Sequence, residues 1–307
     1  MPELAYLGPQ GTFTEQAARA FGGDRKLIPV RTVPHALSAV RAKESDLACV
    51  PLENSVEGAV PATMDALADG EPLTAIAEVV LPIRFSILVR PGTTAVRTIA
   101  SHPHALAQVD NWLTEHLPAA TRLAATSTAA AAEGVAAGEY DAAVTAPIAG
   151  RHYPLRALAT DVADLADAVT RFLVLGRPGG CPPPTGADRT SIMAIPRTSR
   201  TRVLAEMLTE LALRGINISR IESRPLKGRF GEYRFFLDLD GHIAEERVGD
   251  ALAALHRYCH ELRFLGSYPR ADALQSPVHD GTTDADYAAA AKWLAECRAT
   301  TDVGANG

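Results

Sequence analysis

The sequence contains little cysteine and no cluster of basic residues. Its four cysteines, Cys49, Cys181, Cys259 and Cys297, lie far apart, with no CxxC pair and no clustered histidines. This spacing gives no zinc motif and no disulfide framework, so we expect no metal site. The formal net charge is −6 and no run of Lys and Arg occurs, which argues against nucleic acid as a partner.

Long apolar runs and several signature loops are also missing. No window of about 18 apolar residues occurs, so we expect no membrane association. No basic stretch followed by an apolar run begins the chain, and we therefore expect no signal peptide and a cytoplasmic protein. No GxGxxG follows a strand, and neither GxxxxGK[ST] nor GxSxG occurs. These absences argue against dinucleotide binding, P-loop chemistry and serine hydrolysis.

Two regions of the chain differ in their pattern of predicted elements. Residues 1–177 alternate strand and helix signals, which predicts a parallel sheet with helices on both faces. Residues 178–187 are rich in Pro and Gly and form a linker. Residues 188–270 have the order βαββαβ of a ferredoxin-like unit, including a helix near 200–214. Residues 271–307 are predicted to be a weakly ordered tail with one helix at 285–298.

Polar side chains follow the predicted strands of the first region at several points. Ligands of open α/β sheets bind beyond the carboxyl ends of the strands, so these side chains are expected to share one edge. Hydroxyls at helix starts are often only N-caps, and that alternative stays open for each of them. As a set they describe a cleft suited to a small carboxylate ligand. They include Thr12, Glu53, Asn54, Ser55, Ser101, His102, Ser127, Thr128 and Thr145.

Four short motifs occur in order across the two regions. They are Gly8–Phe13 (GPQGTF), Glu53–Gly58 (ENSVEG), Thr170–Phe172 (TRF) and Glu222–Pro225 (ESRP). Together they resemble the prephenate dehydratase family, over about residues 4–270. The resemblance implies an α/β fold, with a two-lobed, periplasmic-binding-protein-like catalytic domain followed by a ferredoxin-like ACT domain. It also implies that the chain crosses between the lobes near 76–82 and 155–165.

This family converts prephenate to phenylpyruvate in phenylalanine biosynthesis, with loss of water and carbon dioxide and without a metal or organic cofactor. The resemblance assigns the handling of the leaving C4 hydroxyl to Thr170. Arg171 offers a positive fork for a substrate carboxylate, with a structural ion pair as the alternative, and Phe172 packs under the cleft. Glu53 and Glu57 are expected to organise loops, because a free carboxylate repels a dianion. The expected substrate-binding residues are Thr12, Asn54, Ser55, Ser127 and Thr128.

The resemblance further implies allosteric regulation by phenylalanine, bound at a domain interface of the ACT domain. The expected effector residues are Gly215, Asn217, Glu222, Ser223 and Arg224, with an ordinary turn residue as the alternative for Asn217. Paired ACT domains imply a homo-oligomer, a dimer through these domains and a tetramer overall.

The sequence departs from the family pattern at two places. His104 stands where the family usually has Gln, so a substrate or loop contact made by the side-chain amide of that Gln is not available in this chain. Arg202-Val203-Leu204 stands where a Gly-Ala-Leu motif usually lines the effector site, which affects the identity of the effector.

Two other functions stay open. The first is arogenate dehydration, the same elimination on the aminated substrate. The second is a non-catalytic amino-acid sensor on a binding-protein scaffold, which the Thr170–Phe172 motif disfavours.

Overall fold

The computed structural model describes residues 1–197, 202–226, 228–229 and 231–302. The chain forms two compact units. The first unit contains Met1–Leu73 and Ala77–Pro178, and the second contains Thr74–Ile76 and Gly179–Gly307. The first unit carries two separate sheets. We call residues 1–73, 77–82 and 169–178 lobe 1, and residues 83–168 lobe 2.

The sheet of lobe 1 has the strand order β2-β1-β3-β11-β5, with β4 paired to β3. Its central strands are continuous apolar runs, as expected for strands covered on both faces. The Thr12 hydroxyl accepts a hydrogen bond from Glu15 N and begins α1. The strands are β1 (Glu3–Leu7), β2 (Lys26–Val30), β3 (Leu47–Asn54), β4 (Gly58–Ala59), β5 (Thr74–Pro82) and β11 (Val169–Gly176), and the helices are α1 (Phe13–Gly22), α2 (Val33–Arg41) and α3 (Pro61–Ala68).

The sheet of lobe 2 has the order β10-β6-β9-β7-β8. Its core contains Ile87, Ile99 and Val144 on one face, while Ala143 and the alanines of α6 pack on the other. The helix α6 ends at Gly138, whose φ of 88° is readily adopted by glycine. The elements are β6 (Ser86–Val89), β7 (Thr98–Ser101), α4 (Pro103–Ala107), α5 (Asp110–His116), β8 (Thr121–Ala124), α6 (Thr128–Ala137), β9 (Ala142–Thr145), η1 (Pro147–Arg151) and β10 (Arg156–Thr160).

Both sheets are mixed, so the prediction of a parallel sheet was wrong for several strands. β1 runs parallel to β2 and β3, but β11 runs antiparallel to β3, and β6 runs antiparallel to β9 and β10. The cause in lobe 1 is the path of the chain. β3 runs toward the boundary with lobe 2, while β11 brings the chain back from lobe 2 and therefore runs in the opposite direction.

The second unit has the predicted order βαββαβ, and its sheet has the antiparallel order β13-β14-β12-β15. Ile192, Leu211, Leu237 and Leu255 form its core between the sheet and the two helices. Residues 198–201, which include the first two residues of the predicted helix, lie outside the described residues. The elements are β12 (Asp188–Pro196), α7 (Val203–Ala212), β13 (Ile218–Pro225), β14 (Tyr233–Asp240), α8 (Glu246–Tyr258) and β15 (Cys259–Pro269).

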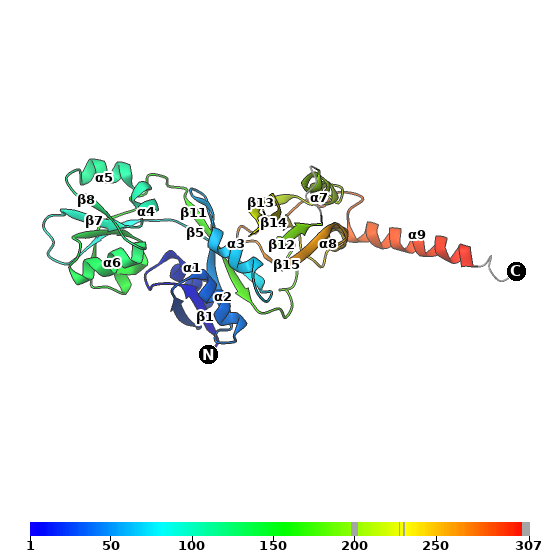
Figure 1. The fold of residues 1–307 in the computed structure, drawn as a ribbon, viewed down its shortest axis with the longest axis horizontal. Helices are drawn as coiled ribbons and strands as arrows, with labels where there is room; N and C mark the ends of the chain where they lie inside the picture. The colour runs from blue at the N-terminus through cyan, green and yellow to red at the C-terminus, as the bar shows by residue number, and fades with distance from the viewer. Residues whose placement is uncertain (198–201, 227, 230, 303–307) are drawn as a thin grey trace. The chain divides into compact units, whose positions relative to one another are not determined.

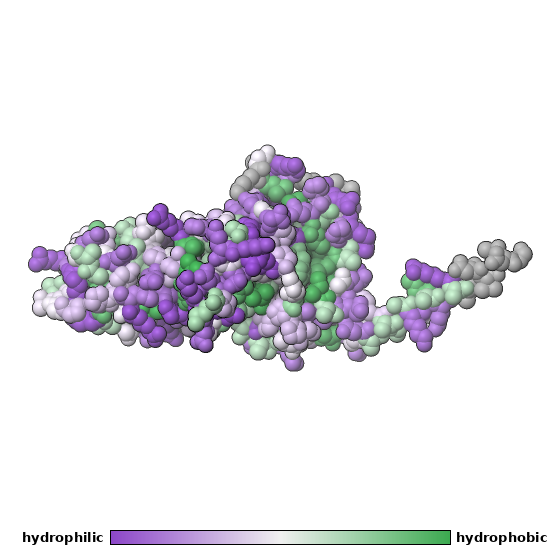
Figure 2. All heavy atoms as spheres, turned by 90° about the horizontal axis from the view of Figure 1, so that it is seen from below, coloured by the Kyte–Doolittle hydropathy of each residue, from purple (hydrophilic) through white to green (hydrophobic). Residues whose placement is uncertain are grey.

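The C-terminal segment is more structured than a weakly ordered tail. It contains α9 (Asp284–Asp302), which is longer than the predicted helix, and Asp284 accepts a hydrogen bond from Glu246 N at the start of α8 (Figure 1). In Figure 2 the visible face of α9 carries hydrophilic and hydrophobic residues, and Trp293 is 64% exposed. Residues 303–307 lie outside the described residues. No helix among the described residues is long and apolar enough to span a membrane.

A buried ion pair lies in the first unit between neighbouring strands of lobe 1. Arg171 Nε on β11 donates to Glu78 Oε2 on β5 across 2.6 Å, and both side chains are almost fully buried. Removing one partner of a buried pair leaves the other charge in a poorly solvating environment. The pair therefore holds the return strand β11 against β5 only while both charges are present.

We predict that Glu78→Gln lowers the free energy of unfolding of the first unit by about 3–5 kcal/mol. The measurement is urea unfolding followed by Trp112 fluorescence, in a Trp293→Phe background so that the signal reports on this unit. Lys26→Ala is the matched control, because Lys26 pairs with Glu3 on the surface and its loss is expected to cost about 0–1 kcal/mol. Equal losses in the two variants would contradict a structural role for the buried pair.

Candidate active site

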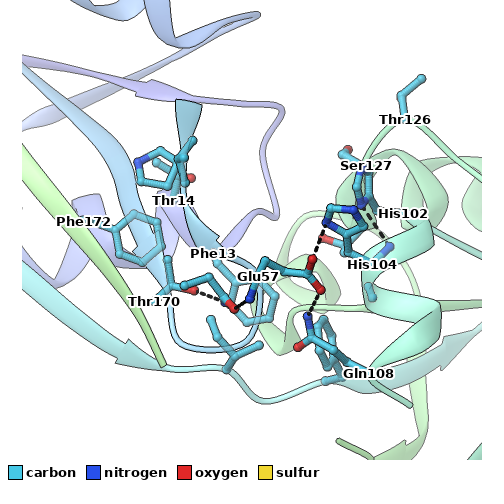
Figure 3. A pocket seen from close by; sticks show the side chains of 17 residues that line it. Phe13, Thr14, Glu57, His102, His104, Gln108, Thr126, Ser127, Thr170 and Phe172 are labelled. Atoms are coloured by element: carbon cyan, nitrogen blue, oxygen red, sulfur yellow. Dashed lines mark hydrogen bonds and ion pairs between the residues drawn. The ribbon is translucent and has the colours of Figure 1, made fainter. Parts of the chain in front are cut away.

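A pocket of about 320 Å³ lies between the two lobes of the first unit (Figure 3). Lobe 1 contributes side chains from the start of α1, the end of β3 and the start of β11. Lobe 2 contributes side chains from α4 and from the start of α6. The pocket therefore lies where polar residues following several strands were expected to meet.

One wall of the pocket is apolar and aromatic. Phe13 and Phe85 meet edge to face with ring centroids 5.5 Å apart, one ring from each lobe. Phe172, which is buried, also lines the pocket, together with the apolar Ile83 and Val60. Such a wall suits a six-membered carbon ring, because it buries apolar surface without competing for the ring's polar substituents.

Thr170 and Asn54 form the polar centre of the pocket. They are register partners of β11 and β3, and Asn54 Nδ2 donates to Thr170 Oγ1 across 2.7 Å. The orientation of the Asn54 side chain is fixed by its amide oxygen, because Oδ1 accepts hydrogen bonds from the backbone N–H groups of Val56 and Glu57. Since Thr170 Oγ1 accepts from Asn54, its own proton stays available to donate to a bound ligand.

The amino end of α6 supplies the opposite side of the pocket. Ser127 and Thr128 both line it. The Ser127 hydroxyl accepts from Ala130 N across 2.9 Å, so it also caps the helix. The positive end of the helix dipole at this position favours a negatively charged ligand group.

Three side chains at the edge of the pocket link the two lobes. His104 Nδ1 lies 3.3 Å from Glu57 Oε2, and Gln108 Nε2 lies 3.5 Å from Glu57 Oε1. The His102 ring packs edge to face on His104, and its Nδ1 accepts from His104 N. Burial, together with the neighbouring His104, lowers the pKa of His102, although Glu57 opposes this shift. His102 is therefore a neutral lining residue near pH 7.

The pocket contains five of the eight residues predicted for the catalytic domain, namely Asn54, Ser127, Thr128, Thr170 and Phe172. The other three are not among its described lining residues. Thr12 caps α1 and donates to Leu7 O, the Ser55 hydroxyl accepts from Val169 N, and Arg171 is paired with Glu78. For Thr12 and Arg171 these are the structural alternatives stated from the sequence.

Several lining residues were not predicted as site residues. Phe13, Phe85 and Gln108 are the main examples, together with His104, which had been noted only as a departure from the family pattern. Phe13 belongs to the first family motif, so its position in that motif was the available signal. Phe85 and Gln108 gave no signal, because an apolar strand residue and a helical Gln are common in any α/β domain.

The predicted effector residues lie at the start of β13 and along it in the second unit. Gly215 has a φ of +64°, and Asn217 Nδ2 donates to Asp240 Oδ2 across 2.7 Å. Successive strand side chains point to opposite faces, so Glu222 and Arg224 share one face and Ser223 lies on the other. The strand therefore does not bring all three side chains to one surface within a single chain.

Glu15 is a buried carboxylate that organises the loop before Phe13. It is 1% exposed and accepts hydrogen bonds from Gly11 N and Arg19 Nε, while His152 Nε2 of lobe 2 lies 2.9 Å from it. Burial alone raises the pKa of Glu15, but the hydrogen bonds from Gly11, Arg19 and His152 outweigh it, so the pKa lies below its ordinary value. Glu15 thus ties the first motif to lobe 2.

Comparison with known proteins identifies the class. A family model for prephenate dehydratase matches residues 4–179, and an ACT domain model matches residues 198–257. The prephenate dehydratase of Amycolatopsis methanolica is 59% identical over 298 residues, which cover 96% of this chain and 97% of that protein. The chain therefore belongs to the prephenate dehydratase family, and the sequence-based prediction of the family and of its two-part α/β fold is confirmed.

Solved structures agree with this assignment. The structure of a prephenate dehydratase from Arthrobacter aurescens in complex with L-Phe has a TM-score of 0.92 and 45% identity, and covers 96% of this chain and 99% of that one. A second structure, described as a novel type of quorum quenching acylase, has a TM-score of 0.80 and 29% identity, and covers 87% of this chain and 98% of that one. The family's fold is thus shared along nearly the whole chain.

We predict that Glu15→Gln lowers stability more at pH 7 than at pH 3. A carboxyl group whose pKa is lowered by folding stabilises the protein above its unfolded-state pKa of about 4.3, and this contribution is lost as the pH falls through the folded-state pKa. Urea unfolding of the wild type and the variant at both pH values, followed by Trp112 fluorescence in the Trp293→Phe background, measures the difference. A loss of the same size at both pH values would contradict the charged role of Glu15.

Proposed function

We propose that this chain is a prephenate dehydratase that converts prephenate to phenylpyruvate, carbon dioxide and water. Membership of the family supports the reaction, and the Asn54–Thr170 hydrogen bond inside the pocket supports this site for it. The ring carboxylate leaves as carbon dioxide and its electron pair forms a ring double bond. In the same step the neighbouring ring double bond shifts toward C4 and the C4–O bond breaks, so the oxygen takes the bonding pair and leaves as water after gaining one proton.

Thr170 serves the leaving hydroxyl in this proposal. The Asn54 amide donates to a lone pair of Thr170 Oγ1, so the hydroxyl proton of Thr170 points toward the ligand. There it stabilises the charge that develops on the departing oxygen. A threonine hydroxyl is a weak acid, so the group acts mainly as a hydrogen-bond donor, and the proton that completes the water comes from solvent. Asn54 sets the direction of that donor.

The remaining lining residues orient the substrate. The aromatic wall around Phe13, Phe85 and Phe172 holds the ring, and the amino end of α6 with Ser127 and Thr128 takes a carboxylate. Orientation of this kind brings the scissile C4–O bond to Thr170 and lowers the entropic part of the barrier. Thr12, Ser55 and Arg171 support the lining residues from behind, by capping α1, pairing β11 and holding Glu78.

We predict that Thr170→Val lowers kcat by about 10²–10⁴-fold with a modest change in KM, because it removes the hydroxyl and keeps the shape. Thr170→Ser is the matched control and is expected to keep much of the activity. Phenylpyruvate formation from prephenate is the measurement. Incubating the wild type with prephenate and with arogenate also tests the sensor alternative, since a sensor forms no product from either. Near-normal turnover by Thr170→Val would remove Thr170 from this role.

We also propose that phenylalanine regulates the enzyme through residues 188–270, with residues 178–187 as the linker after a catalytic domain of residues 1–177. The ACT match and the L-Phe complex of the Arthrobacter aurescens protein support this proposal. Glu222, Ser223 and Arg224 lie on two faces of one strand, so a site using all of them needs a second chain. That requirement supports a homo-oligomer, with a dimer through the ACT domains and a tetramer as its further assembly.

We predict that Asn217→Ala raises the phenylalanine concentration for half-maximal response by about 5–30-fold, the effect of one lost hydrogen bond, and leaves the basal rate unchanged. Asn217 lies at the turn before β13, and its side-chain amide donates a hydrogen bond to Asp240. The substitution therefore removes a possible contact with the effector and also loosens this turn. A rate titration with phenylalanine on both proteins is the measurement. An unchanged response would exclude Asn217 from the effector site.

A further inference from the structure

Charge is unevenly distributed around the pocket. Among its described lining residues there is no Lys or Arg, and Glu57 is the only carboxylate. Prephenate carries two carboxylates, so an uncovered Glu57 at the edge of the pocket would repel it at close range, although the Glu57 side chain is 37% exposed and water screens part of its charge. A local partner for Glu57 therefore favours binding of the dianion.

His104 and Gln108 are the local partners of Glu57. Each carboxylate oxygen of Glu57 has its own partner, His104 at 3.3 Å and Gln108 at 3.5 Å, and both partners come from α4 and its C-cap in lobe 2 (Figure 3). Glu57 itself lies between β3 and β4 in lobe 1, directly after the Asn54 turn. The covering groups and the covered carboxylate thus meet only when the two lobes are together.

The same carboxylate would have the opposite effect on an aminated substrate. Arogenate carries an ammonium group where prephenate carries a keto group, and a carboxylate in the pocket is a natural partner for an ammonium ion. While His104 and Gln108 each contact one oxygen of Glu57, this carboxylate is less available to an ammonium group. The cover over Glu57 therefore favours the keto acid and disfavours the amino acid.

We propose that His104 is a specificity-determining residue, which covers Glu57 and thereby selects a 2-oxo acid dianion over the corresponding 2-amino acid. This inference rests on the proposed dehydratase function and goes beyond it by naming the group that discriminates between the two substrates. His102 supports His104 by packing on its ring and accepting its backbone N–H. Gln108 donates a hydrogen bond to the other carboxylate oxygen of Glu57 and keeps part of the cover when His104 is lost.

The test compares kcat/KM for prephenate and for arogenate in the wild type and in His104→Ala. The substitution is expected to raise KM for prephenate about tenfold and to raise the ratio of arogenate to prephenate kcat/KM by at least as much. His104→Gln keeps a donor for Glu57 and is expected to keep the wild-type ratio. Glu57→Gln combined with His104→Ala removes the carboxylate and is expected to restore the ratio.

His116→Ala is the matched control, because His116 lies on α5, stacks on Trp112 and does not line the pocket. The ratio of arogenate to prephenate kcat/KM in His116→Ala is expected to stay at the wild-type value. If His104 merely ties the lobes together, its loss lowers kcat/KM for both substrates by one factor and leaves the ratio unchanged. That result would overturn the proposal.

The outcomes for the wild type separate this inference from the function on which it rests. If the wild type converts prephenate but the ratio of arogenate to prephenate kcat/KM is the same in His104→Ala, the dehydratase function is supported and only the role of His104 is overturned. A wild type that prefers arogenate also overturns it. A wild type that forms no product from either substrate overturns the dehydratase function itself.

Discussion

The antiparallel pairing of β11 with β3 is the contact on which the site depends. It returns the chain from lobe 2 to a position between β3 and β5 in the lobe 1 sheet and sets Thr170 opposite Asn54. These two residues are 116 positions apart, yet the pairing brings the Asn54 amide to 2.7 Å from the Thr170 hydroxyl. A shift of one residue would turn the side chains of the shifted strand to the other face of the sheet and separate this pair.

Alternation along β11 gives neighbouring residues different tasks. Thr170 and Phe172 reach the pocket, whereas Arg171 between them is buried against Glu78 and stabilises the strand. The motif therefore combines a polar group, a structural anchor and part of an apolar wall. A family motif of three consecutive residues does not imply three contacts with the substrate, because a strand presents only every second residue to one face.

The pocket is bounded by contacts between the two lobes at several points. Phe13 meets Phe85 in the wall, Glu57 meets His104 and Gln108 at the edge, and Glu15 meets His152 behind the first motif. Each contact joins a motif of lobe 1 to lobe 2. The arrangement that assembles the hydroxyl, the amide and the helix terminus therefore also covers the carboxylate of Glu57.

Local pattern in the sequence determined much of this protein: the alternating elements of the first unit, the βαββαβ order of the second, and the motifs that identify the family. It also predicted Asn54, Ser127, Thr128, Thr170 and Phe172 as site residues, and these five line one pocket between the two lobes, because strand ends and helix starts have local signatures. Only the tertiary structure decided the direction of β11, the pairing of Arg171 with Glu78 and the cover over Glu57. Those features are contacts between residues distant in the chain, and a local pattern does not encode which distant partner a charged side chain meets.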